Sequence, residues 1–368
     1  MTAITGVPQL IPSAPATAAT PAVRGFDLHP AYFAMVMATG IVSIASQLLG
    51  YAAIARVLFA ANIVFYVVLW SLTLIRLVRR PRQMGADLAS HSRGVGFFTI
   101  VAGTCVLGTQ ALLVGNSPRV ATALWFLGIA LWVPLTYAIF GLLTVKKDKP
   151  SLAEGINGGW LVSVVAAQSV CVLGAQLSST FGAYRPQALF FCLAVWLGGG
   201  MLYVWIISLI FYRYTFFTLN PSDLSPPYWI NMGAVAISTL AGTMLIANAP
   251  ASDMVMSLLP FIKGMTLLFW ATATWWIPML LFLGIWRHVY NRFPLRYDPL
   301  YWGAVFPLGM YTSCTIRLSS ILDGAGFLMG IPRVFIFVAQ AAWLMTFVGL
   351  VHRLLTLYRQ GQLRPQSH

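Results

Sequence analysis

The chain has 368 residues, of which 59% are hydrophobic and only 8% are charged, and its formal net charge is +14. A soluble domain carries about 25% charged residues, so this few could not cover a water-facing surface of such a size. The composition therefore excludes a soluble enzyme, a nucleic-acid-binding domain and a disordered chain, and it predicts a polytopic membrane protein.

Ten apolar segments are long enough to cross a membrane as helices, which takes about 20 mostly apolar residues. In chain order they are 30–49, 54–77, 94–114, 120–143, 156–177, 188–212, 228–248, 263–286, 300–322 and 333–356. Lipid admits only helices or closed barrels, and segments of this length favour helices. The sequence therefore predicts an all-α integral membrane fold of ten transmembrane helices.

The connectors between these segments differ in charge. Of the 22 Lys and Arg residues, 16 fall in connectors on one side and 6 on the other. The positive-inside rule then places both termini in the cytoplasm of a multi-pass protein of the cell membrane. We expect a flexible cytoplasmic tail at 1–28, a membrane domain at 29–358 and a second cytoplasmic tail at 359–368.

Two classes of span alternate along the chain. The odd-numbered spans hold 35 Gly, Ser, Thr, Asn and Gln in 107 residues, the even-numbered spans hold 20 in 121, and ten of the 13 Trp are on even spans. Small polar residues suit close helix packing or a wet path, whereas large apolar residues can face lipid. This alternation predicts five helical hairpins, with the odd helices in an inner ring around a central pore and the even helices outside. Tight packing alone explains the same composition equally well.

Helical periodicity gives each odd span one polar or small face, because residues 4, 7 or 11 apart lie on the same side of a helix. Five such faces could line a narrow wet path. The candidate pore-lining residues are Thr39, Ser43, Thr99, Gly103, Gln110, Gln168, Asn231, Ser238, Gly242 and Ser313.

The position of the acidic residues indicates the sign of the solute. All eight Asp and Glu lie in connectors or at span ends, whereas cation sites and proton relays generally need a carboxylate inside the membrane. A path lined by hydroxyls and amides suits an anion. Arg317 is the one basic residue well inside an odd span and is the candidate anion-attracting charge; the alternative is that it snorkels to the nearby interface.

Catalytic and metal-binding patterns are missing from the sequence. The four Cys are isolated within apolar segments, and the five His fall on the expected cytoplasmic side or in the tail. We find no nucleophile elbow, no zinc-protease motif and no phosphate-binding loop. We therefore expect no catalytic residues, no metal, no cofactor and no nucleic-acid partner.

Three segments in the right order resemble the tellurite-resistance/dicarboxylate transporter family. They open the first, seventh and ninth spans and read HPAYFAMVMATG at 29–40, PPYWINMGA at 226–234 and YWGAVFP at 301–307. The family includes the slow-type anion channels of plant guard cells, fungal malic acid transporters and sulfite exporters. The resemblance extends from about residue 26 to 358.

This resemblance implies five helical hairpins around a pore in each subunit and assembly as a homotrimer in the lipid bilayer. In the family, a Phe that directly precedes the Pro of the ninth span plugs the pore. The resemblance therefore makes Phe306 and Pro307 the candidate gate.

The leading functional hypothesis is transmembrane passage of small anions, either chloride- or nitrate-like or C4-dicarboxylate. The alternative is a proton-coupled or exchange transporter for malate or another dicarboxylate, sulfite or tellurite. A third class, an integral-membrane enzyme or haem protein, has only the scattered His residues in its favour.

Overall fold

The computed structural model describes residues 28–360, which form helices and no strands. The all-helical prediction is confirmed, and each long helix overlaps one of the ten expected spans. The long helices are α1 (Ala34–Leu48), α2 (Ala52–Arg79), α4 (Phe98–Leu113), α5 (Pro118–Val145), α7 (Val162–Leu177), α8 (Arg185–Phe216), α9 (Ile230–Asn248), α11 (Leu259–Ile285), α12 (Trp302–Ile321) and α13 (Gly330–Arg359). The expected tails at 1–28 and 359–368 lie mostly outside the described residues. Only residues 28, 359 and 360 of these tails are described.

Eight segments of the described chain are long and apolar enough to cross a membrane. One of them, Gly158–Phe216, contains both α7 and α8. The helix α12 is not among the eight; it packs against α1, α9 and α13, so it need not be apolar enough to face lipid. The chain is a multi-pass membrane protein.

Five helices form a closed ring. Helix α1 packs against α4, α4 against α7, α7 against α9, α9 against α12, and α12 against α1. These are the odd-numbered spans. In the segments that contain α4 and α9, 94% of the most apolar 18-residue stretch is buried inside the protein. The corresponding share is 17% in α2 and in α5. The division into inner and outer helices agrees with the alternation in composition.

The five outer helices cover this ring in a repeating pattern. Each packs on the inner helix that precedes it in the chain: α2 on α1, α5 on α4, α8 on α7, α11 on α9, and α13 on α12. Each also contacts the next inner helix around the ring. Large apolar side chains on the outer helices remain exposed, as expected for a surface that meets acyl chains.

Each inner helix begins with a short 3₁₀ turn, and these turns form a second ring. They are η1 (Pro30–Phe33), η2 (Gly94–Phe97), η3 (Gly158–Leu161), η5 (Pro226–Trp229) and η8 (Pro299–Tyr301). Side chains of His29, Asn157 and Asp298 cap three of them by accepting a backbone N–H. Because all five turns meet, the inner helices run parallel, with their positive dipole ends gathered at what we call the turn end.

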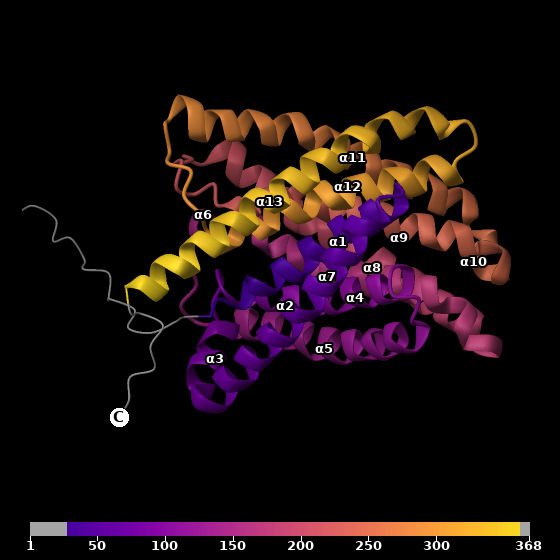
Figure 1. The fold of residues 1–368 in the computed structure, drawn as a ribbon, viewed down its shortest axis with the longest axis horizontal. Helices are drawn as coiled ribbons and strands as arrows, with labels where there is room; N and C mark the ends of the chain where they lie inside the picture. The colour runs from indigo at the N-terminus through magenta and orange to yellow at the C-terminus, as the bar shows by residue number, and fades with distance from the viewer. Residues whose placement is uncertain (1–27, 361–368) are drawn as a thin grey trace, which may run out of the picture.

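The connectors divide between the two ends of the bundle. Figure 1 shows α3 (Pro81–Leu88) and α6 (Leu152–Gly155) at one end, the turn end, and α10 (Asp253–Ser257) at the opposite or far end. The other short helices are η4 (Ser178–Tyr184), η6 (Ala249–Ala251), η9 (Ala325–Met329) and the π-helical η7 (Trp286–Tyr290), which continues α11. Both ends of the described chain also lie at the turn end (Figure 1).

Candidate functional site

A small cavity of about 20 Å³ lies within the ring and is lined by residues from all five inner helices. Ten of its lining residues are apolar side chains or cysteine. The polar members are Thr109, Ser169, Gln176, Ser313 and Arg317. The lining comes from the middle and the C-terminal half of each helix, so the cavity occupies the part of the ring away from the turn end.

One face of α12 runs along the cavity. Met310, Ser313 and Arg317 line it, and their spacing of three and four residues keeps them on one side of the helix. Phe306 lies one turn earlier on the same face, is fully buried and is not part of the lining. The lining on α12 thus begins one turn after Phe306, at Met310.

Pro307 fixes the helix next to that ring. A proline has no N–H, so the carbonyl of Gly303 lacks its usual helical partner at this point. The pyrrolidine packs closely on α9, because a Cβ at Gly233 would lie only 2.7 Å from Pro307 Cγ. The helix α12 is thus held against α9 next to Phe306.

The hydroxyl of Ser313 is unpaired within the described chain. It is fully buried, and its Oγ has no hydrogen-bond partner in residues 28–360. A Ser or Thr hydroxyl in a helix commonly donates to the carbonyl four residues earlier, as the neighbouring Thr312 does to Leu308 O at 2.9 Å. An unpaired buried hydroxyl is unfavourable, and a polar solute in the cavity would relieve that cost.

Arg317 brings a positive charge to the same cavity. Its side chain is partly buried, and no carboxylate of the described chain lies within ion-pairing distance of it. Its position in the lining favours a charge that faces the cavity over one that snorkels to lipid. Ser313 and Arg317 are the two predicted site residues that the structure brings together there.

Four other predicted residues bond to outer helices. Thr39 accepts a hydrogen bond from Trp343 Nε1 at 2.9 Å, and Gln110 accepts one from Asn62 Nδ2 at 2.6 Å. The two remaining contacts are Ser43 Oγ to Ala55 O at 2.7 Å and Gln168 Nε2 to Trp196 O at 3.0 Å. These polar groups join helices across the bundle, and the structure does not place them in the cavity lining.

The other predicted residues also serve contacts between elements. Trp196 donates to Ser238 O at 2.8 Å, and Tyr203 donates to Asn231 O at 3.2 Å. Thr99 donates to Pro30 O at 3.1 Å, Gly103 approaches Val36, and Gly242 approaches Thr266 so closely that a Cβ would fall within 2.1 Å of its Oγ1. Small residues thus let the helices pack closely, which is the second explanation that the composition allowed, whereas Ser238 and Asn231 contribute only backbone carbonyls to these contacts.

The sequence pattern missed Thr109, Ser169 and Gln176 in the lining. Ser169 and Gln176 are seven residues apart and share a helical face, so periodicity could have grouped them. The adjacent Gln168 offers an equally polar face, however, and periodicity alone cannot tell which face meets the ring axis.

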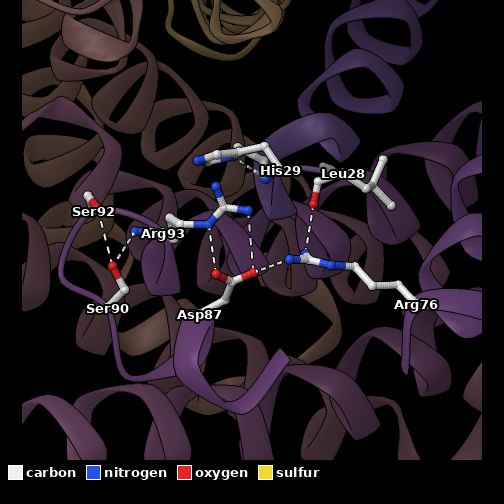
Figure 2. A network of polar contacts seen from close by, with 8 residues as sticks. Leu28, His29, Arg76, Asp87, Ser90, Ser92 and Arg93 are labelled. Carbon is white, nitrogen blue, oxygen red and sulfur yellow. Dashed lines mark hydrogen bonds and ion pairs between the residues drawn. The ribbon is translucent and has the colours of Figure 1, made fainter. Parts of the chain in front are cut away.

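The carboxylates stay out of the ring. Of the described residues, no Asp or Glu lies in the ten long helices. Asp87 is buried in the connector helix α3, where its two oxygens pair with Arg76 Nη2 at 2.6 Å and Arg93 Nε at 2.8 Å (Figure 2). Arg76 also donates to Leu28 O at 2.7 Å, so this cluster ties the start of the described chain to α2 and α3.

Comparisons with known proteins place these features in a family. A family model described as voltage-dependent anion channel matches residues 27–351. The chain is 40% identical over 169 residues to an uncharacterized membrane protein of Mycobacterium tuberculosis (strain H37Rv), a match that covers 44% of this chain and 81% of the relative.

Two relatives match over nearly the full length. An uncharacterized transporter of Methanocaldococcus jannaschii is 24% identical over 338 residues, 89% of this chain and 95% of the relative. A protein of Trichophyton rubrum named as a sulfite efflux pump is 24% identical over 346 residues, 89% of this chain and 91% of the relative.

Proposed function

The chain belongs to the voltage-dependent anion channel family, and from this premise we propose that each subunit carries small anions across the membrane through its ring of inner helices. Membership confirms the resemblance drawn from the segments at 29–40, 226–234 and 301–307. It makes the chain a membrane transporter of anions rather than an enzyme.

The observation that carries the proposal is the chemistry of the ring cavity. A cavity lined by all five inner helices contains an unpaired guanidinium at Arg317 and an unpaired hydroxyl at Ser313. The ten long helices of the described chain hold no carboxylate to attract a cation. Donors and positive charge in a water-poor path favour an anion.

Phe306 is the proposed gate of this path. Its side chain is fully buried one turn before the cavity-lining Met310, and an apolar side chain in a narrow passage excludes water and ions until it moves aside. Pro307, packed on Gly233, would hold the backbone still while the side chain of Phe306 changes rotamer.

We further propose that the turn end faces the cytoplasm, with both termini on that side of the cell membrane. The excess of Lys and Arg in its connectors supports this orientation. Assembly as a homotrimer, as the family resemblance implies, would give each subunit its own conduit, because the ring closes within one chain.

The candidate substrates are chloride- or nitrate-like anions and C4-dicarboxylates. The relative named as a sulfite efflux pump specifically favours sulfite as a further candidate. The second candidate function is a proton-coupled or exchange carrier for malate, sulfite or tellurite. Measuring the reversal potential at two pH values separates a channel from a proton-coupled carrier. The reversal potential of a simple channel follows the anion gradient alone, whereas that of a proton-coupled carrier also shifts with the pH gradient.

Flux of anions into liposomes that contain the purified protein tests the proposal. We expect flux above that of empty liposomes and a decrease of about tenfold in Arg317→Gln, because the cavity loses its only positive charge. Arg333→Gln is the matched control, since Arg333 is exposed on α13 and does not line the cavity. Flux no greater than in empty liposomes would overturn the proposed function, and equal flux in the two variants would remove Arg317 from it.

A further inference from the structure

Three outer helices end, at the turn end, with a buried arginine. These residues are Arg76 on α2, Arg213 on α8 and Arg287 directly after α11. For Arg76 and Arg213, an aspartate of the following connector approaches the guanidinium. Asp87 pairs with Arg76 at 2.6 Å (Figure 2), and Asp223 lies 3.7 Å from Arg213 Nη2. Burial of these two cations is therefore offset by a carboxylate 11 or 10 residues further along the chain.

The third arginine lacks this neutralisation. Asp298 stands 11 residues after Arg287, but its Oδ1 accepts the backbone N–H of Leu300 at 2.8 Å and caps η8 instead. In residues 28–360, no carboxylate lies within ion-pairing distance of Arg287. Its Nε and Nη1 have no hydrogen-bond partner there, although the residue is only 6% exposed.

The local backbone holds this guanidinium in place. The Arg287 Cζ atom lies 4.4 Å from the centre of the Phe293 ring. The loop that carries the ring is closed by Phe293 N to Arg287 O at 3.0 Å and by His288 Nδ1 to Phe293 O at 2.9 Å. An aromatic face orients a cation and attracts it weakly, but it supplies no hydrogen-bond acceptor for the free N–H groups.

Two tyrosines surround the same position. The hydroxyl of Tyr228 lies over Gly284, one turn before Arg287, where a Cβ would come within 3.2 Å of it. Tyr301 ends η8, and η8 contacts η5, the turn that carries Tyr228. These tyrosines belong to η5 and η8, so the guanidinium lies beside the N-terminal ends of α9 and α12, where helix dipoles also favour an anion.

We propose that Arg287 binds a small oxyanion at the turn end, at a site separate from the ring cavity. The anion would accept from the free guanidinium N–H groups and from the phenols of Tyr228 and Tyr301, and it would neutralise a buried charge that is otherwise costly. This inference goes beyond transport and does not depend on it, because binding can be measured without flux.

Thermal unfolding of the full-length protein in maltoside detergent tests the site, with nitrate as the probe and gluconate, a much larger anion, as the reference salt at equal concentration. We expect the midpoint of the wild-type protein to rise in nitrate. In Arg287→Gln the nitrate-dependent rise should be lost, while its midpoint in gluconate should equal or exceed that of the wild type. The matched control is Arg296→Gln, an exposed arginine in the same connector, which should keep the full rise.

The measurement is repeated in an Arg317→Gln background, which removes the charge of the ring cavity. The rise that depends on Arg287 should persist there. Tyr301→Phe is a second variant, which keeps the aromatic ring but removes the hydroxyl. It should need about 2- to 10-fold more nitrate than the wild type to reach half of the increase in thermal midpoint.

Three results would overturn the proposal. One is an Arg287→Gln protein that keeps the wild-type rise in nitrate. Another is an Arg287→Gln protein with a lower midpoint in both salts and an unchanged rise, which is the pattern of a purely structural arginine. The third is a rise with added phosphatidylglycerol and none with nitrate, which would assign the guanidinium to a lipid headgroup.

Discussion

At the scale of single residues, one face of α12 presents three chemistries in sequence. From the turn end these are the phenyl ring of Phe306, the hydroxyl of Ser313 and the guanidinium of Arg317. The polar pair can replace part of an anion's hydration, whereas the ring offers nothing to an ion. In the proposed path, Ser313 and Arg317 would attract the anion and Phe306 would block its passage.

Shortening the gate residue should open the path. We expect Phe306→Ala to raise anion flux in liposomes several-fold. Phe306→Leu keeps an apolar side chain of intermediate size, so its flux should lie between those of the wild type and Phe306→Ala. Removing a buried ring also costs about 3–5 kcal/mol of stability, so the amount of folded protein must be matched by size-exclusion chromatography. Flux in Phe306→Ala that equals the wild type would remove Phe306 as the gate.

At the scale of elements, close contacts between inner and outer helices depend on glycine and on single polar groups. Gly242 on α9 faces Thr266 on α11, and Trp196 on α8 donates to the Ser238 carbonyl of α9. Such contacts set how far the helices stand apart, and hence the width of the ring inside them.

Adding one methyl group at this interface should loosen it. In Gly242→Ala the new Cβ would lie 2.1 Å from Thr266 Oγ1, so the two helices must separate, and we expect a loss of about 1–3 kcal/mol of stability. Gly264→Ala on α11 is the control, because nothing lies within 4 Å of its Cβ position. The stability of both variants is measured as the thermal unfolding midpoint in detergent. Equal midpoints for Gly242→Ala and Gly264→Ala would contradict the packing assigned to Gly242.

The connector helix α3 depends on a buried ion cluster. In Asp87→Asn, Arg76 and Arg93 lose their shared carboxylate, and removing one partner of a buried ion pair costs about 3–5 kcal/mol. The exposed Asp253 on α10 makes no ion pair in the described chain, so Asp253→Asn should leave the thermal midpoint unchanged. Similar midpoints for Asp87→Asn and the wild type would show that the cluster adds no net stability.

At the scale of the whole molecule, the sequence could predict which helices form the ring. Inner helices are enclosed by protein and keep small residues, whereas outer helices carry ten of the 13 Trp residues and meet lipid. The sequence also singled out Arg317 as the basic residue well inside an odd span, with snorkelling as the alternative, and the structure places it in the cavity lining.

The face of each inner helix that meets the cavity was not predictable. Gln168 and Ser169 are neighbours and both polar, yet Ser169 lines the cavity and Gln168 donates to Trp196. Trp343, the partner of Thr39, lies 304 residues away in the chain. Periodicity defines a face, but only the folded positions of such distant partners decide whether it points to the axis or to an outer helix.

The central claim is that the ring cavity is the path of the anion, and cysteine accessibility tests it most directly. In a chain whose four native Cys are replaced, Ser313→Cys and Ser238→Cys are each treated with a charged thiol reagent in liposomes. We expect modification to block flux in Ser313→Cys, which faces the cavity, and to leave Ser238→Cys unaffected, because the Ser238 hydroxyl bonds back to Ala234 O. Unchanged flux in Ser313→Cys, or equal block of Ser238→Cys, would contradict the claim.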